Sequence, residues 1–171
     1  RREGRVLVTN HRNIQSQKAL EAKVYIIHEN DAWVAPLLEA LSEQNIPYEQ
    51  WFISEGLIDL QATPPQGVFY NRMSASSHTR DHRFAIELTG PLIAWLESHG
   101  RRVLNNRRAT ALEVRKFEQY IGLQKHGLQT PRTLAAVGID NVREAAKKLD
   151  QWPLILKPNR GGTGRGVQLF Q

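Results

Sequence analysis

Apolar residues in the first half of the chain follow two spacings, one typical of strands and one typical of helices. Residues 24–28 and 48–53 are short apolar runs and are predicted strands. The apolar residues between them recur at helical spacing (Val34, Leu37, Leu38 and Leu41). Asn30 or Asp31 can cap this helix, and Pro47 lies beyond its end. Such an order of strand, helix and strand favours a parallel sheet.

The same alternation continues to about residue 105. Residues 67–71 are a third predicted strand, and residues 103–104 are a short fourth one. Between them, residues 84–99 have the apolar spacing of a helix that Gly100 is suited to end. The polar segment 72–82 follows the third strand directly. It therefore lies at the carboxyl end of a strand in a parallel sheet, where such sheets bind ligands.

The pattern changes after residues 105–109, which are the predicted domain boundary. Thr110 and Glu113 form a capping box that opens a helix carrying Lys116, and Gly127 closes this helix. The remaining predicted elements are a strand at 132–137, a helix from Asn141 to residue 149, and strands at 153–156 and 167–170.

These elements predict two domains of different architecture. Residues 23–105 form an open α/β domain with a parallel sheet, and residues 106–171 form a second domain of α+β type. Residues 1–22 show no clear period and are left unassigned.

Composition limits the class of protein. Of the residues, 40% are hydrophobic and 23% are charged, which is typical of a folded globular chain. No apolar run approaches ~18 residues, so no transmembrane helix is expected. The chain has no cysteine, which excludes disulfides and agrees with a cytoplasmic location. The net charge is +6, but the basic residues are scattered rather than gathered with aromatic residues, which argues against a nucleic-acid interface.

A glycine-rich loop between the last two predicted strands is the strongest candidate for chemistry. It comprises Gly161, Gly162, Thr163, Gly164, Arg165 and Gly166, with Lys157 shortly upstream. Backbone amides, a hydroxyl and cations are suited to holding phosphate oxygens. Val167 follows Gly166 where a P-loop would have a Lys and a helix, so the loop is predicted to be a lid between antiparallel strands. The alternative is an ordinary glycine-rich hairpin.

The lid resembles that of the ATP-grasp superfamily, in which a strand ending in Lys-Pro precedes a glycine-rich lid and a Gly-Val strand. Lys157 and Pro158 match the strand end, and residues 161–167 match the lid. The run 115–131 and the order of elements are similar to the alpha-L-glutamate ligases and, more distantly, to glutathione synthetase. In these enzymes a lysine about forty residues before the lid lysine binds nucleotide phosphate, and Lys116 occupies the matching place.

The resemblance implies a fold and a set of site residues. The fold is an open parallel-sheet pre-ATP-grasp domain followed by the first part of an α+β ATP-grasp domain. Lys116, Lys157 and the lid would bind ATP. Arg72, Ser74 and Arg80 match an Arg-x-Ser stretch facing the active site of the glutamate ligases, so they are candidates for holding a substrate carboxylate. The alternative for segment 72–82 is a solvated loop that caps the next helix.

The resemblance further implies an ATP-dependent carboxylate–amine ligase that forms an amide or peptide bond through an acylphosphate, adding an amino acid such as glutamate. Mg²⁺ is expected with it, with the metal ligands downstream of this chain, so the chain alone would be inactive. His78 and His82 are spaced as a pair of helical metal ligands, but without a third ligand the spacing is weak. A non-catalytic nucleotide-binding module and a basic nucleic-acid-binding protein remain alternatives, and a homo-oligomer is left open.

Overall fold

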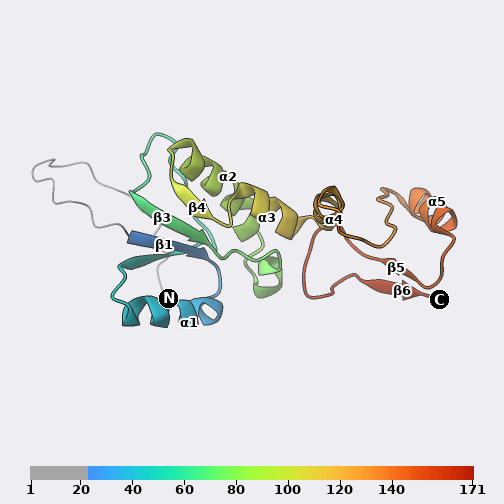
Figure 1. Cartoon of the computed structure of the whole chain (residues 1–171), viewed down its shortest axis with the longest axis horizontal. Coiled ribbons are helices and arrows are strands. Elements are labelled where there is room, and N and C mark those ends of the chain that lie inside the picture. The colour runs from blue at the N-terminus through green and yellow to red at the C-terminus, as the bar shows by residue number, and fades with distance from the viewer. Residues whose placement is uncertain (1–22) are drawn as a thin grey trace, which may run out of the picture. The chain divides into compact units, whose positions relative to one another are not determined.

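The computed structural model describes residues 23–171, and the unassigned segment 1–22 lies outside the described residues. The first part of the chain contains a four-stranded sheet in the order β2-β1-β3-β4 (Figure 1). Its strands are β1 (Lys23–His28), β2 (Tyr48–Phe52), β3 (Gly67–Asn71) and β4 (Arg102–Leu104). Every pairing in this sheet is parallel, as the strand-helix-strand pattern predicts.

Helices α1 (Asp31–Glu43) and α2 (Ala85–Ser98) lie on opposite sides of the sheet (Figure 1). Ile27 of β1 and Phe69 of β3, both fully buried, form one core cluster with Leu92 and Leu96 of α2. Successive side chains of a strand point to opposite faces, so the equally buried Ile26 serves the other face. The sheet is therefore covered on both faces, as parallel sheets require.

The predicted signals at the helix ends are confirmed in this part of the chain. Asn30 caps α1, because its side-chain oxygen accepts a hydrogen bond from the amide of Trp33 at 3.3 Å. Gly100 follows α2 with φ +68°, the left-handed conformation that glycine adopts readily after a helix. The polar segment after β3 folds into the short 3₁₀ helix η1 (Ser77–Arg80). No helix within residues 23–171 has the length and apolar character needed to cross a membrane.

The chain divides after Thr110 into two compact units, and this division falls within helix α3 (Arg107–Val114). The second unit contains α4 (Lys116–Lys125), α5 (Ile139–Leu149) and the strands β5 (Leu154–Leu156) and β6 (Gln168–Phe170). The two strands pair antiparallel, with Ile155 opposite Leu169, and the glycine-rich loop connects them. The side chains of this hairpin remain exposed, at 63% for Ile155 and 59% for Leu169.

The single helix predicted from Thr110 to Gly127 is wrong. Two helices occupy this stretch, because Arg115 between them has an extended backbone with φ −123° and ψ 103°. Thr110 is not a cap either. The side chain of Asn106 accepts from the amides of Arg108 and Ala109 and so caps α3 four residues earlier.

Two further predictions in the second unit are wrong. Residues 132–137 pair with no strand within residues 23–171, and the structure leaves them irregular. The apolar side chains of a short segment are not enough for a strand when no neighbouring strand offers hydrogen bonds. Asn141 lies inside α5 rather than at its cap, where Gly138 stands with φ +86°. Instead, Asn141 Nδ2 donates to the carbonyl of Val137 at 2.9 Å.

Candidate functional site

Several residues of the glycine-rich loop in the second unit have positive φ angles, a backbone conformation that is strained for most residues other than glycine. Gly161, Gly164 and Gly166 have φ of +119°, +74° and +75°, and Thr163 has φ +57°. At Gly166 the glycine is also required by space, because a Cβ there would lie 2.8 Å from Cγ of Pro158. Pro158 at the end of the Lys-Pro strand and Gly166, the last glycine of the loop, therefore pack against each other.

Helix α4 begins directly against the residues that lead into this loop. The amide of Lys116 donates to the carbonyl of Asn159 at 3.1 Å, and the amide of Phe117 donates to Oδ1 of Asn159 at 2.9 Å. These bonds satisfy two of the amides that the first turn of a helix leaves without an intrahelical partner. Asn159 thus fixes the start of α4 to the loop, a role that the sequence did not suggest.

The two candidate lysines both reach this junction. Nζ of Lys116 donates to the carbonyl of Gly161 at 2.9 Å. Nζ of Lys157 donates to the hydroxyl of Tyr120 at 2.5 Å and lies 4.8 Å from the centre of the Tyr120 ring. Tyr120 is four residues after Lys116 on α4, so both belong to one face of the helix. The structure therefore places Lys116, Lys157 and Gly161 beside the same helical face.

The loop keeps several hydrogen-bond donors. Within the described residues, the amides of Gly162, Thr163, Gly164 and Gly166 donate to no protein group. The hydroxyl of Thr163 donates to the carbonyl of Gly162 at 2.8 Å, and the side chain of Arg165 is exposed. Backbone amides in a left-handed turn, with ammonium groups nearby, are chemically suited to phosphate oxygens.

The first unit has a separate polar cluster at the carboxyl ends of β1 and β3, built around Glu29. The side chain of Glu29 is only 1% exposed. It accepts hydrogen bonds from Nε and NH2 of Arg80 at 3.1 and 2.5 Å, and it pairs with Nδ1 of His82 at 2.9 Å. Burial alone would raise the pKa of Glu29, but the hydrogen bonds from Arg80 and His82 outweigh it and the pKa is lowered. Glu29 is therefore a buried carboxylate.

Arg80 also contacts the other side chains of this cluster. Its NH1 donates to Oγ of Ser76 at 3.2 Å, and its guanidinium carbon lies 4.5 Å from the centre of the Trp33 ring. Ser76 Oγ is in turn 2.9 Å from Ser74 Oγ. Ser74 and Arg80, two of the three predicted carboxylate ligands, thus meet through Ser76. The third candidate is Arg72, whose guanidinium carbon lies 5.8 Å from the centre of the Tyr70 ring. Among the described residues, this guanidinium makes no hydrogen bond to Ser74 or Arg80.

Two histidines flank this cluster through one aromatic ring. The ring of Phe52 lies edge-on to His82 at 5.5 Å and to His28 at 5.4 Å between centres. His28 is 1% exposed, and burial lowers its pKa. His78 does not join them, and no group of three His, Cys, Asp or Glu side chains within residues 23–171 could hold a metal ion.

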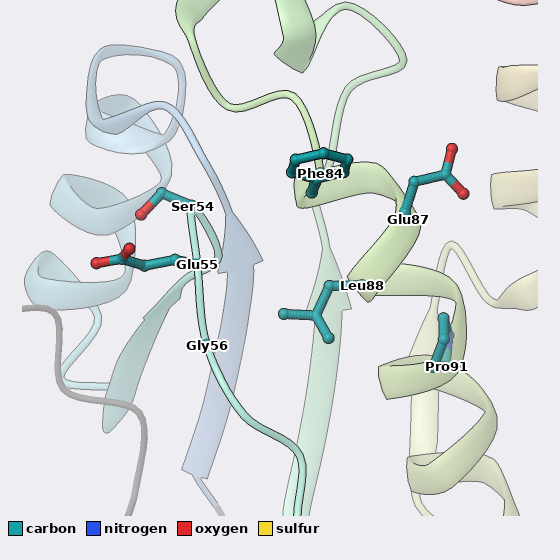
Figure 2. A pocket seen from close by; sticks show the side chains of 7 residues that line it. All are labelled: Ser54, Glu55, Gly56, Phe84, Glu87, Leu88 and Pro91. Atoms are coloured by element: carbon teal, nitrogen blue, oxygen red, sulfur yellow. The ribbon is translucent and has the colours of Figure 1, made fainter.

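A hollow of about 460 Å³ opens between the loop after β2 and the first turns of α2. Figure 2 shows Ser54, Glu55 and Gly56 on the loop and Phe84, Glu87, Leu88 and Pro91 on the helix. Leu88 points towards the loop, whereas the carboxylates of Glu55 and Glu87 point away from each other. The wall that faces the hollow is therefore mainly apolar.

Sequence reasoning missed Glu29 and the buried Asn71. Asn71 ends β3 and donates from Nδ2 to the carbonyl of Asn105 at 3.0 Å and to Oγ1 of Thr110 at 2.8 Å. A signal for Glu29 was present, because an acidic residue directly after a buried strand points to the carboxyl edge where the polar segment 72–82 also lies. The partners of Glu29 are 51 and 53 residues away, so the pairing itself had no local signal.

Comparison with known proteins gives matches only among solved structures, since no protein-family model and no curated protein matches the chain. A RimK domain ATP-grasp protein from Sphaerobacter thermophilus DSM 20745 aligns with a TM-score of 0.66 at 18% identity, covering 88% of this chain and 55% of its own. The ATP-grasp ligase PsnB, complexed with precursor peptide PsnA2 and AMPPNP, aligns with a TM-score of 0.57 at 19% identity, covering 92% and 60%. PsnB with a minimal precursor, Mg and ADP aligns with a TM-score of 0.54 at 18% identity, covering 87% and 57%. The chain thus spans somewhat more than half the length of these structures.

Proposed function

We propose that this chain, which has the fold of ATP-grasp ligases over somewhat more than half of their length, is part of an ATP-dependent ligase. The reaction would join a carboxylate to an amine as an amide or peptide bond through an acylphosphate. Likeness of fold alone does not carry an activity, so the proposal depends on the residues of the site. One observation supports it most. Lys116 and Lys157, separated by 41 positions, both reach the face of α4 next to the glycine-rich loop.

The cations and backbone amides of this junction are suited to the phosphates of a nucleoside triphosphate. Lys116 has three N–H donors and uses one on Gly161, so it can contact a phosphate oxygen without leaving the loop. Lys157 and the unpaired loop amides add a second cation and directed hydrogen bonds. ATP would supply the phosphoryl group, and phosphoryl transfer depends mainly on positioning and on cancelling negative charge. We assign both tasks in part to these side chains and to the closing of the loop.

Within residues 23–171 no group of three or more His, Cys, Asp or Glu side chains could hold a metal ion, so these residues offer no complete protein site for Mg²⁺. We therefore derive no step through the ion from this chain. One of the aligned PsnB structures contains Mg and ADP.

The substrates we propose are amino acids or peptides. PsnB was solved with a precursor peptide, and a peptide or amino acid such as glutamate supplies both a carboxylate and an amine. In this chain, Arg80 and Ser74 are the candidates for contact with a substrate carboxylate. Arg72 stays a candidate on sequence grounds alone.

Nucleotide binding is tested directly on this chain with AMPPNP and isothermal titration calorimetry. Lys116→Ala and Lys157→Ala are each expected to weaken binding about tenfold, because a hydrogen bond from a charged donor contributes about 1.5 kcal/mol. Lys125→Ala is the matched control, since this exposed lysine ends the same helix. Equal affinity in all four proteins would refute the phosphate site.

The reaction is tested in the natural protein by ADP release. ATP turnover is expected only when an acidic acceptor and an amine are both supplied. The acceptor's carboxylate is needed to form the acylphosphate, and the amine is needed to react with it. Failure across a broad panel of amino acids and peptides would contradict the ligase assignment even if AMPPNP binds.

A further inference from the structure

The hydrogen bonds of Arg80 leave one side of its guanidinium unused. A guanidinium has five N–H groups. Among the residues that the structure describes, Nε and Nη2 donate to Glu29 and Nη1 donates to Ser76, so three of the five are used. The remaining two belong to the terminal nitrogens Nη1 and Nη2, one on each. The side chain of Arg80 is 24% exposed, so part of it is open to solvent.

Glu29 holds this arginine in one orientation. Both carboxylate oxygens of Glu29 take part, which fixes the plane of the guanidinium rather than only its position. The ring of Trp33 covers the guanidinium at 4.5 Å, and Trp33 itself is anchored in the first turn of α1 by the Asn30 cap. Few of the freely rotating states of an arginine side chain remain.

The charges of the cluster show that this arginine would act by geometry rather than by net charge. The single negative charge of Glu29 compensates the positive charge of Arg80. An anion attracted to this cluster would therefore gain from directed hydrogen bonds, which favour a planar carboxylate.

We propose that Glu29 is a positioning residue for a carboxylate subsite formed by the terminal N–H groups of Arg80. The subsite lies at the carboxyl edge of the parallel sheet, where ligands of such sheets bind. Its identification with an amino acid or peptide carboxylate rests on the proposed function. Neither Glu29 nor Ser76 was a candidate from the sequence.

The experiment measures binding of glutarate to the chain, without nucleotide, by ¹⁵N NMR of the Arg80 Nε–H and of the Trp33 indole. Glutarate is expected to shift both signals. Glu29→Gln is nearly isosteric and removes the charge, so it is expected to raise the dissociation constant about fivefold or more and to abolish the protected Nε–H signal. Glu39→Gln on α1 has the same change in charge on an exposed side chain and is expected to leave binding unchanged.

The opposite result is equally well defined. If Arg80 acted only as a charge, removal of Glu29 would unmask it and glutarate would bind more tightly, which would overturn the proposal. Arg80→Lys keeps the charge and leaves Glu29 in place, and it is expected to lose binding because lysine has no planar fork. Retained binding in Arg80→Lys would also overturn it, and this variant remains informative if Glu29→Gln fails to fold.

Two further arms separate the subsite from generic anion binding and from the ligase. Inorganic phosphate at matched ionic strength is expected to shift the Arg80 signal less than glutarate, and an equal response would overturn the carboxylate assignment. Because no nucleotide is present, glutarate binding at Arg80 supports the subsite even if AMPPNP does not bind. Conversely, if AMPPNP binds but glutarate does not, the carboxylate subsite is refuted and the nucleotide site is not.

Discussion

Replacing Gly166 with alanine tests whether the last lid glycine is required by space as well as by conformation. Gly166 and Gly164 have nearly the same φ, +75° and +74°, so alanine at either position has the same left-handed strain of about 1 kcal/mol. At Gly166 the new Cβ would lie 2.8 Å from Cγ and 3.3 Å from Cδ of Pro158, whereas at Gly164 no atom of residues 23–171 would lie within 4 Å of it. A proline ring cannot rotate away, so overpacking adds about 1–3 kcal/mol at Gly166 alone.

Amide hydrogen exchange in β5 and β6 measures the outcome. Gly164→Ala is expected to increase exchange of the hairpin amides about fivefold, from about 1 kcal/mol of strain. Gly166→Ala is expected to increase it by a further factor of about ten or more, because each 1.4 kcal/mol is tenfold. Similar exchange in the two variants would refute the packing of Pro158 on Gly166. AMPPNP affinity should fall in the same order if the loop closes on phosphate.

Three further predictions concern the rest of the chain. The pKa values of His28 and Glu29 are both lower in the folded state than in the unfolded chain, so the unfolded chain binds more protons and acidification lowers the free energy of unfolding. The loss is expected first below about pH 6.5, from His28, and again below about pH 4.5, from Glu29. Urea midpoints measured across pH should lack the first decrease in His28→Phe and the second in Glu29→Gln. Asn71→Ala should lower the free energy of unfolding of the first unit by about 2 kcal/mol, because the partners Asn105 and Thr110 lose a buried donor; an unchanged urea midpoint would contradict this. Gly122→Ala should stabilise α4 by about 0.5–1 kcal/mol, since the new Cβ meets only Leu112 at an ordinary 3.5 Å, and slower amide exchange in α4 checks it.

The fold class could be predicted from the sequence because local signals and tertiary packing agree in the sheet domain. Strands covered on both faces need continuous apolar runs, and residues 24–28 supply one. Asn30 and Gly100 mark helix ends through their own backbone chemistry, without help from distant residues. The hairpin after Pro158 was also predictable, because Val167 and its followers offer no helical period.

The errors occur where distant contacts decide the structure. The predicted helix through residue 115 breaks there because Asn159, far along the chain, binds the amides of Lys116 and Phe117 and starts a new helix. Residues 132–137 have strand-like composition, but the described part of the chain offers them no partner strand. Two of the three predicted carboxylate ligands meet in the structure, yet the buried Glu29 that orders them could not be identified without the fold. Their binding roles stay predictions.

The solvent-exposed β5–β6 hairpin of the second unit affects how the protein behaves in concentrated solution. Both edges of a two-stranded ribbon offer backbone groups to another chain, and here the ribbon also bears uncovered Ile155 and Leu169. Such an edge is a template for pairing between molecules, so aggregation, more than unfolding, will set the highest concentration at which the purified chain can be studied. A charged residue placed at Ile155 should extend that range without disturbing the Glu29 cluster.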